Sequence, residues 1–345
     1  MAIGKHRVTV MGGGIFGLSC AYACQRLGAR VTVIEKRRIG AGSSGGTVGA
    51  LAPHVPENWN PKKQFQIESL LMAADFWAGV AGLSGIDPGY ARTGRIQPLQ
   101  DDADIAKARA RAAGAAKYWP AWAWWRVEVA TDAFSPLSPT GLVLSDGLTA
   151  RLDPRAALAA LAGAIEAAGG AIAQGDRPPD DGAPVIWATG AEGLAMLSED
   201  LGRLVGNGVK GQSATLGFSA PDAPQIYADG LHIVPHADGT TGIGSTSERG
   251  VDDPATDEGL ETLIARARAV CPALADAPVI DRWAGFRPRA VSRAPLLGAW
   301  PGRPGHYVAN GGFKIGFGMA PKVAQVMADL VLNGRDAIPE GFRLV

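Results

Sequence analysis

The sequence predicts an α/β fold with two domains, one built on a parallel sheet and the other an α+β domain built on a mainly antiparallel sheet. Three observations support this prediction. A strand–helix–strand pattern opens the chain, a third short apolar run ends at Gly190, and residues 208–247 alternate apolar and polar positions between turn signals. The length of 345 residues is more than one small core usually serves, so two domains are expected.

The parallel sheet is expected to begin near the N-terminus. Residues 8–11 form a short apolar run that ends in glycines, as strands buried on both faces do. Residues 17–27 are small and apolar and are followed by Gly28, which favours a helix that ends at this glycine. Residues 30–35 are predicted to form the second strand, and residues 184–190 the third.

The other elements follow from periodicity, composition and capping residues. Asp153 and Pro154 are a typical helix start, with aspartate as the cap and proline in the first turn. Residues 280–318 are expected to carry strands separated by glycines. The segments predicted to be helical are 62–83, 102–117, 152–168, 257–270 and 321–333.

Charge and cysteine content argue against several classes of protein. Lys and Arg total 33 and balance 33 Asp and Glu, so no net field favours nucleic acid or an anionic membrane. Cys20, Cys24 and Cys271 have no zinc-site spacing and are too few for a disulfide framework, so we expect reduced thiols and no metal site. With no signal-peptide pattern and no apolar run near the roughly 18 residues that span a bilayer, we expect a cytoplasmic protein without a transmembrane segment.

A glycine-rich turn joins the first strand to the first helix in the pattern Gly12-x-Gly14-x-x-Gly17. The first glycine permits a tight turn, the second lets a pyrophosphate approach the backbone, and the third lets helix and strand pack closely. The helix N-terminus adds free N–H groups and a positive dipole for phosphates. Glu35 ends the second strand, where its carboxylate can accept hydrogen bonds from ribose hydroxyls. Together these features predict a dinucleotide site.

Further motifs occur in order along the chain. Residues 43–51 are rich in serine and glycine, residues 187–190 read Trp-Ala-Thr-Gly, and residues 285–288 read Gly-Phe-Arg-Pro. A second glycine-rich segment, residues 310–321, precedes the last helix. On these motifs the chain resembles, over nearly its whole length, the family of FAD enzymes that includes D-amino acid oxidase, glycine oxidase and sarcosine oxidase. The resemblance implies a Rossmann-like FAD-binding domain of the glutathione-reductase type beside an α+β substrate domain.

Elements of the two kinds alternate along the chain, so both domains are expected to be discontinuous. The FAD-binding domain is assigned to 1–80, 146–206 and 284–345, and the substrate domain to 81–145 and 207–283. The residues that the motifs and the resemblance assign to the cofactor are Gly12, Gly14, Ile15, Phe16, Gly17, Glu35, Lys36, Ser43, Ser44, Gly45, Thr47, Ala188, Thr189, Gly190, Gly285, Arg287, Gly311, Gly312, Phe313, Lys314, Ile315 and Gly316.

Four residues are candidates for the substrate site. The resemblance implies that Arg287 binds a substrate carboxylate, for which a forked guanidinium is well suited, and that Lys314 makes a second contact to it. The alternatives are an arginine that bridges the domains and a solvated surface lysine. His232, where glycine oxidases tend to carry a tyrosine, is either a pocket donor or a core histidine. His54 is a further candidate for the site, with a purely structural role as its alternative.

Two departures from the family bear on the cofactor and its reoxidation. The sarcosine-oxidase branch attaches its flavin through a cysteine near residues 285–287, and this stretch has none, so the resemblance implies non-covalent FAD. The lysine that activates oxygen in that branch would fall near residues 242–246, where this chain has none. An oxidase and a dehydrogenase with another electron acceptor therefore both stay open, as does association into a homo-oligomer.

A group of tryptophans, Trp119, Trp122, Trp124 and Trp125, is interpreted first as a packing surface and second as part of a substrate cage. The function that the resemblance implies is oxidation of the C–N bond of a small amino acid or N-alkyl amino acid, by hydride transfer to FAD and hydrolysis of the imine to a 2-oxo acid. The alternatives are an FAD-dependent 2-hydroxy-acid dehydrogenase and a flavin-binding subunit of a larger redox complex.

Overall fold

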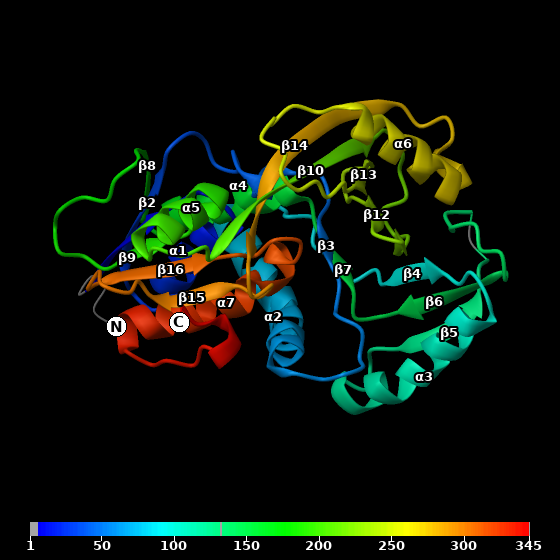
Figure 1. Cartoon of the computed structure of the whole chain (residues 1–345), viewed down its shortest axis with the longest axis horizontal. Coiled ribbons are helices and arrows are strands. Elements are labelled where there is room, and N and C mark those ends of the chain that lie inside the picture. Colours follow the sequence, from blue (N-terminus) through cyan, green and yellow to red (C-terminus); the bar gives the residue numbers. More distant parts are fainter. Residues whose placement is uncertain (1–5, 132, 345) are drawn as a thin grey trace.

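The computed structural model describes residues 6–131 and 133–344, which form two lobes around two large sheets (Figure 1). The first sheet has six strands in the order β15-β16-β9-β1-β2-β8. All of its neighbouring strands run parallel except the edge pair β15 and β16. Its strands are β1 (Arg7–Met11), β2 (Arg30–Glu35), β8 (Ala171–Gln174), β9 (Val185–Trp187), β15 (Leu296–Ala299) and β16 (His306–Asn310).

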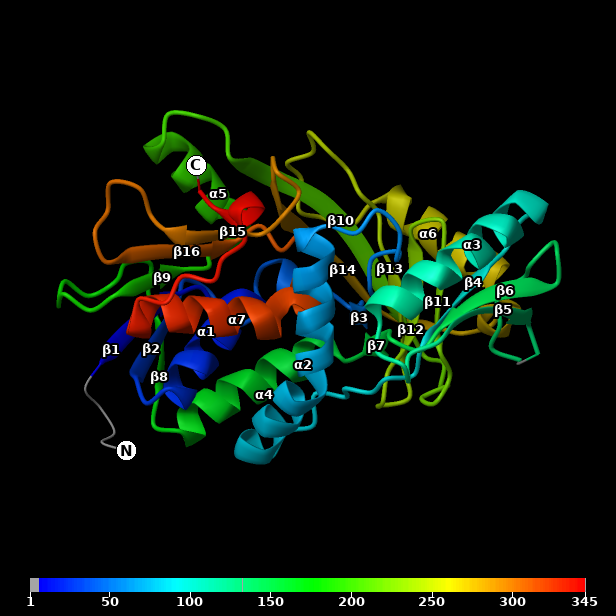
Figure 2. The same cartoon turned by 90° about the horizontal axis from the view of Figure 1, so that it is seen from below.

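Helices cover both faces of the six-stranded sheet. Because side chains alternate along a strand, Val8 and Val10 of β1 face one side and Met11 the other. The first side packs on helices α1, α4 and α7, which lie side by side in Figure 2. The second side packs on α5. These helices are α1 (Ile15–Arg26), α4 (Pro154–Ala167), α5 (Gly190–Asp200) and α7 (Gly316–Asn333).

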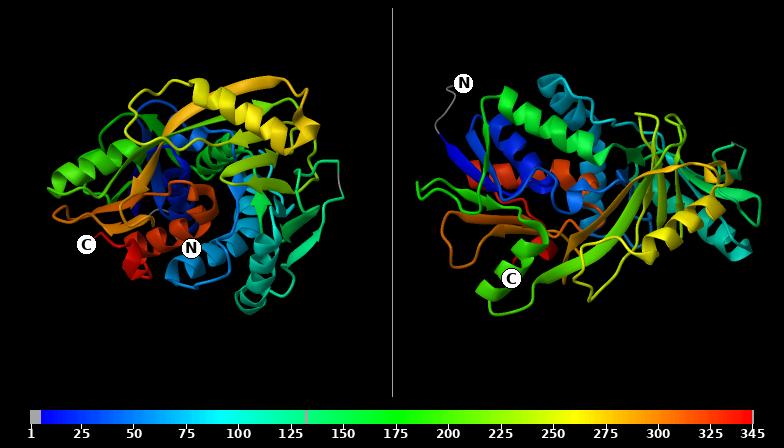
Figure 3. Two further views of the ribbon diagram at one scale, coloured as in Figure 1. Left: turned by 45° about the vertical axis from the view of Figure 1, so that its right-hand side comes forward. Right: turned by 90° about the horizontal axis from the view of Figure 1, so that it is seen from above.

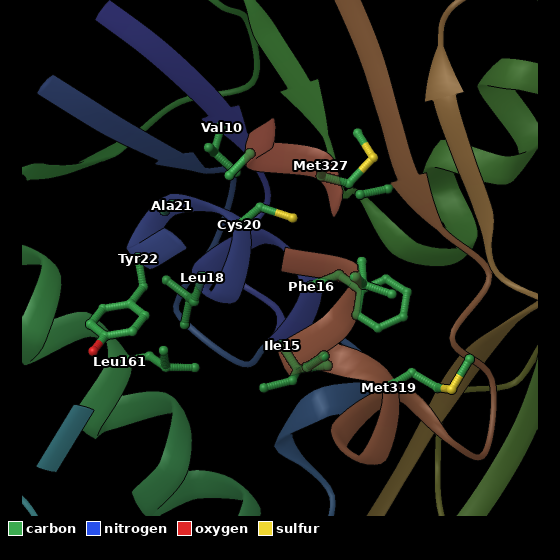
Figure 4. Packing of buried hydrophobic residues seen from close by; sticks show 14 of the residues in the cluster. Val10, Ile15, Phe16, Leu18, Cys20, Ala21, Tyr22, Leu161, Met319 and Met327 are labelled. Carbon is green, nitrogen blue, oxygen red and sulfur yellow. The ribbon is translucent and has the colours of Figure 1, made fainter. Parts of the chain in front are cut away.

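The core beneath this sheet brings together segments from the two ends of the chain. Figure 4 shows Val10 of β1, Cys20 of α1 and Met327 of α7 gathered in one apolar cluster. Cys20 and Cys24 are buried there, and Cys271 is buried in the other lobe. All three cysteines are free, which confirms the prediction of reduced thiols.

The second sheet has eight strands in the order β14-β10-β13-β12-β11-β4-β6-β5. Its neighbouring strands are antiparallel except β11 and β4, so the mainly antiparallel sheet is confirmed. Three of its strands, at 95–98, 125–129 and 142–146, were not predicted from the sequence. The strands are β4 (Arg95–Pro98), β5 (Trp125–Val129), β6 (Leu142–Asp146), β10 (Gly206–Leu216), β11 (Gln225–Ala228), β12 (Leu231–Pro235), β13 (Thr241–Gly244) and β14 (Val279–Ala290).

Register across the eight-stranded sheet decides which side chains are free for a site. Ala214, Ile243, Ile233 and Ile226 pair in one row and belong to the apolar cluster that also contains buried residues of α6 (Glu258–Val270). The side chains of the next row must therefore point to the opposite face. That row contains Ser213, Gly244, His232 and Tyr227.

Two long strands connect the lobes. β10 and β14 pair over most of their length and run from the six-stranded lobe into the eight-stranded lobe (Figures 1 and 3). Most strands of each sheet come from the segments predicted for each domain, but β6, β10 and β14 each cross an expected boundary. The exact domain boundaries stay a prediction.

The last helix differs from its predicted bounds. α7 begins at Gly316, before the predicted start at Pro321, so Pro321 lies inside the helix. A proline within a helix usually removes a backbone hydrogen bond. Here the adjacent Lys322 N–H donates to Ser69 Oγ at 3.2 Å, so a buried hydroxyl on α2 (Pro61–Ser84) serves as acceptor. The earlier start places Lys314 directly before the helix N-terminus.

Helix α2 is long and apolar enough, by length and composition alone, to cross a membrane. Its best window has a mean hydropathy of 1.2, and a third of that window is buried in the fold. Phe65, Leu70 and Trp77 are core residues, and the helix packs on α4 and α7. Core helices of globular domains share this composition, so the helix is weak evidence for a membrane span.

The tryptophans of residues 119–125 divide into two pairs. Trp119 and Trp125 are buried, with ring centroids 5.5 Å apart in an edge-on arrangement beside helix α3 (Asp102–Tyr118). Trp122 and Trp124 are 53% and 40% exposed and stack under Arg92 and Arg126. This arrangement agrees with the packing interpretation.

The packing of α1 on β1 yields a stability prediction. A Cβ at Gly17 would lie 1.9 Å from the Gly12 carbonyl oxygen, so Gly17→Ala must separate the helix from the strand. We expect it to lower the free energy of unfolding by about 1–3 kcal/mol, the usual cost of overpacking. Gly82→Ala is the control, because a Cβ there meets nothing within 4 Å and alanine favours a helix. Thermal melting should separate the two variants, and equal midpoints would contradict the prediction.

Candidate active site

A cavity of about 850 Å³ lies between the two sheets. One end is lined by the loops that follow β1, β2 and β9, at the carboxyl edge of the six-stranded sheet. The other end is lined by the free face of the eight-stranded sheet, including Ser213, Tyr227 and His232. The segment that follows β16 closes the cavity between them. Ligands of open parallel sheets bind at this carboxyl edge.

Close backbone packing shapes the first end. Gly12 has φ +108°, and a Cβ there would lie 2.5 Å from the carbonyl oxygen of Ala188. Gly14 is the N-cap of α1 and has no side-chain cap, and the first turn carries no acidic residue. The N-terminus of α1 therefore presents N–H groups and its positive dipole end to an anion in the cavity.

Two side chains brace the loops around this helix end. Glu35 accepts hydrogen bonds from the Gly13 N–H at 2.7 Å and from the Arg37 N–H at 2.9 Å. Ser44 Oγ accepts from the Ile15 N–H at 3.0 Å. The Glu35 carboxylate retains lone pairs beyond these two bonds, so it can still accept from the hydroxyls of a ribose.

Most of the residues predicted to bind the cofactor line this cavity. Gly17, Gly45 and Gly311 do not. A Cβ on Gly17 or Gly45 would lie within 2.2 Å of a neighbouring carbonyl oxygen, so both glycines serve close backbone packing. Gly311 has φ +77° and forms the turn after β16.

At the other end, the Arg287 guanidinium is 7% exposed and has no ion-pair partner among the described residues. Its terminal nitrogens donate to Ser245 Oγ and to the carbonyl oxygens of Thr246 and Lys210, while Nε has no partner. Burial lowers the pKa of Arg287 to about 10. A cation held out of water in this way favours an anionic ligand.

Lys314 lies beside Arg287 on the same aromatic ring. The ring centroid of Phe313 is 5.6 Å from the Arg287 guanidinium carbon and 5.9 Å from Lys314 Nζ. Burial and then the charge of Arg287 lower the pKa of Lys314. Phe313 has φ +45°, a strained conformation for a non-glycine residue, and it sets the direction in which Lys314 leaves the chain.

The two candidate histidines also line the cavity. His232 packs on Tyr227, with ring centroids 4.8 Å apart, and its Nδ1 has no hydrogen-bond partner. Burial, followed by the charges of Arg95 and Lys314, lowers the pKa of His232 to about 3, so the ring is neutral at physiological pH. His54 is held by Gln66, whose Oε1 accepts from the His54 N–H at 2.8 Å, and burial lowers its pKa.

Arg95, Tyr227 and Gln66 line the cavity but were not identified from the sequence. Arg95 and Tyr227 lie on two neighbouring strands, β4 and β11, of which the sequence analysis did not identify β4. The sequence signal that could have indicated Arg95 is an arginine directly before Ile96 in a short strand-like segment. Gln66 lies within the correctly predicted helix α2, where a buried amide among apolar residues was the signal.

Comparison with known proteins identifies the family. The model of the FAD dependent oxidoreductase family, DAO, matches residues 7–330. The chain belongs to this family. It is therefore an FAD-dependent oxidoreductase, and the α/β fold and the cofactor predicted from the sequence are confirmed.

Individual relatives match over nearly their whole lengths. The chain is 29% identical to a glycine oxidase of Pseudomonas aeruginosa, covering 97% of this chain and 96% of the relative. The structure of glycine oxidase from Geobacillus kaustophilus matches with a TM-score of 0.84 at 23% identity over 99% of both chains. Iminodiacetate oxidase from Chelativorans sp. BNC1 matches with a TM-score of 0.82 at 24% identity over 98% of both chains.

The residues of the cavity fit FAD. A close glycine turn, a helix N-terminus with no cap from its own N-cap residue Gly14 and a carboxylate at the end of β2 are the groups that a pyrophosphate and a ribose require. We propose that Gly12, Gly14, Ser44 and Glu35 hold the dinucleotide. None of the described residues that line the cavity is a cysteine, in keeping with the expectation of a non-covalent flavin.

Glu35→Gln tests the ribose contact. We expect the variant to keep its fold and to bind FAD about tenfold more weakly, because a neutral amide replaces a charge-assisted acceptor. The dissociation constant is measured by titrating flavin-free protein with FAD and following flavin fluorescence. Glu199→Gln, on the exposed end of α5, is the matched control and should leave the constant unchanged. Equal constants for the two variants would exclude the contact.

Proposed function

We propose that the protein oxidises the C–N bond of a small amino acid or N-alkyl amino acid. Membership of an FAD-dependent oxidoreductase family supports a redox reaction. The observation that carries the substrate class is a pair of cations, the buried Arg287 and the more exposed Lys314, beside one ring in the same cavity as the dinucleotide motif. A carboxylate is an anion that this pair suits, because Arg287 has an unpartnered Nε and Lys314 carries an ammonium, and hydrogen bonds between ionised groups are strong.

Each residue has a defined task in the reaction that we propose. Arg287 and Lys314 hold the substrate carboxylate and so fix the direction of its α-carbon. FAD, when bound, supplies the redox chemistry by accepting the hydride that leaves the α-carbon. Loss of hydride from a neutral amine leaves an iminium ion, and addition of water then releases a 2-oxo acid and an ammonium ion or a protonated amine. The contribution of the protein is orientation and electrostatics.

The state of His232 favours an amine over a 2-hydroxy acid. Oxidation of a hydroxyl group by hydride loss needs a base that takes the hydroxyl proton. His232 has an unpartnered Nδ1, but a pKa of about 3 makes it a weak base. An amine that enters in its neutral form needs no such base, so the site suits C–N oxidation better.

Helix α7 adds a second source of positive potential. Its first residues, Gly316 and Phe317, line the cavity, and its N-terminus has no side-chain cap and no acidic residue in the first turn. The dipole of this helix would stabilise negative charge that develops on the reduced cofactor.

Anaerobic bleaching of the bound flavin tests the reaction class. The holoenzyme is mixed with glycine, sarcosine, proline, the two enantiomers of alanine, and lactate. We expect bleaching by at least one amine and none by the hydroxy acid. Bleaching by lactate alone would overturn the proposal. Comparison of aerobic turnover with dye-coupled turnover then identifies the acceptor.

Arg287→Lys tests the carboxylate contact. The lysine keeps the charge but loses the forked geometry, so we expect KM for the best amine substrate to rise about tenfold to a hundredfold while FAD stays bound. Arg282→Lys, on the exposed part of the same strand, is the control. An unchanged KM in Arg287→Lys would exclude the contact.

Lys314 predicts a pH dependence of carboxylate binding. Its lowered pKa means that the ammonium loses its charge as pH rises through a value below the usual range for lysine. The dissociation constant for acetate, which is fully ionised there, should therefore increase as pH rises from neutral toward the usual lysine pKa of about 10.4. In Lys314→Met the constant should be high throughout, and this increase should be smaller. Lys322→Met, a lysine on α7 outside the cavity lining, is the control and should behave as wild type.

A further inference from the structure

Arg95 is a third cation at the end of the cavity that the eight-stranded sheet lines, the substrate end. It lies on β4, is 6% exposed, and lines the cavity with Tyr227 on the neighbouring strand. Its Nε donates to Asp146 Oδ2 at 2.8 Å, and its guanidinium carbon lies 5.8 Å from the centre of the Tyr227 ring. Neither terminal nitrogen has a hydrogen-bond partner among the residues that the structure describes.

This pairing leaves the two terminal nitrogens of the Arg95 guanidinium, its fork, available to a ligand. Asp146 is fully buried behind it, and its second oxygen accepts from the Thr149 N–H at 3.0 Å. A purely structural ion pair of this kind is most stable when every polar group is satisfied. Here the aspartate is satisfied by the Nε and by the backbone, while the two terminal nitrogens, the part of arginine that binds carboxylates best, remain without protein partners.

The position of Arg95 complements that of Lys314. After burial, the charges of Arg95 and Lys314 both lower the pKa of His232, and all three residues line the same cavity. His232, Tyr227 and Arg95 come from the adjacent strands β12, β11 and β4, whose side chains share the cavity face of the sheet. No aspartate or glutamate of the described residues lines the cavity at this end, since Glu35, Asp176 and Glu192 all belong to the dinucleotide end.

We propose that Arg95 binds a second carboxylate, so that the substrate is an amine that carries two carboxylates. This inference rests on the proposed function, because it adds a second anchor to the carboxylate site of Arg287 and Lys314. The second carboxylate belongs either to the side chain of an amino acid, as in aspartate or glutamate, or to the substituent on nitrogen, as in iminodiacetate. In both cases the same fork receives it.

Binding of inert ligands tests the subsite without turnover. The holoenzyme is titrated with acetate and with malonate, succinate and glutarate, and the change in flavin absorbance gives each dissociation constant. We expect the best dicarboxylate to bind at least about tenfold more tightly than acetate, the gain from one charge-assisted contact. A dicarboxylate advantage below twofold overturns the proposal.

Variants locate the effect at Arg95. Arg95→Lys keeps the charge opposite Asp146 but removes the fork, and it should weaken dicarboxylate binding about tenfold while leaving acetate binding unchanged. Arg95→Gln combined with Asp146→Asn removes both charges, so no unpaired buried carboxylate remains, and it should abolish the preference. Arg126→Lys, an exposed arginine on β5, is the matched control. Equal losses for acetate and dicarboxylates in Arg95→Lys overturn the proposal.

Turnover separates this inference from the proposed function. If iminodiacetate or an acidic amino acid bleaches the flavin, and its kcat/KM falls in Arg95→Lys, the subsite and the proposed function are both supported. The better of these substrates then shows whether the second carboxylate lies on the side chain or on the nitrogen substituent. If only monocarboxylic amines are oxidised and Arg95→Lys does not change their kinetics, the subsite is wrong and the proposed function stands. If dicarboxylates bind through Arg95 but no amine is oxidised, the subsite stands and the proposed function is wrong.

Discussion

The contact between α1 and the end of β1 is the constraint on which the rest of the structure depends. The Gly12 carbonyl oxygen lies where a side chain at position 17 would begin, so α1 can pack this closely on the end of β1 only with a glycine at that position. This packing aims the free N–H groups of α1 into the cavity and brings Gly12 against Ala188 at the end of β9. The cofactor end of the cavity is therefore defined by backbone atoms, which explains why glycines dominate its sequence signal.

The substrate end is defined by register across the eight-stranded sheet. One row of side chains packs in the apolar core against α6. The side chains of the adjacent row, which includes His232 and Tyr227, therefore face the cavity. A one-residue slip in β12 would exchange Ile233 with His232, bury the imidazole among apolar residues and empty the site. Core packing in this lobe thus maintains the site even though the core residues do not touch the cavity.

The sequence contained much of the site because its strongest signals are local. Glu35 stands at the end of a βαβ pattern, while Arg287 and Lys314 lie in short motifs rich in glycine and phenylalanine, so neighbouring residues identify all three. Arg95 has no such neighbourhood. Its strand has only four residues, and the partners of that strand are β6 and β11, far away in sequence. The pairing that brings Arg95 to the cavity is a tertiary property that local patterns do not encode. The start of α7 was misplaced for a different reason, since Pro321 reads as a helix start but the buried Ser69 hydroxyl lets the helix continue through it.

The charges of the substrate end explain why an anion belongs there. Burial lowers the pKa of Arg287, Lys314 and His232 in the same direction, which means that each cationic form is less stable in the fold than in water. Only Arg95 has a carboxylate of its own, and Asp146 contacts it through Nε alone. At Arg287, hydrogen bonds to neighbouring oxygens and the charge of Glu248 offset only part of this electrostatic cost, and a bound carboxylate would lower it further. Because substrate binding itself lowers this cost, the affinity of the site depends on the number of carboxylates in the ligand.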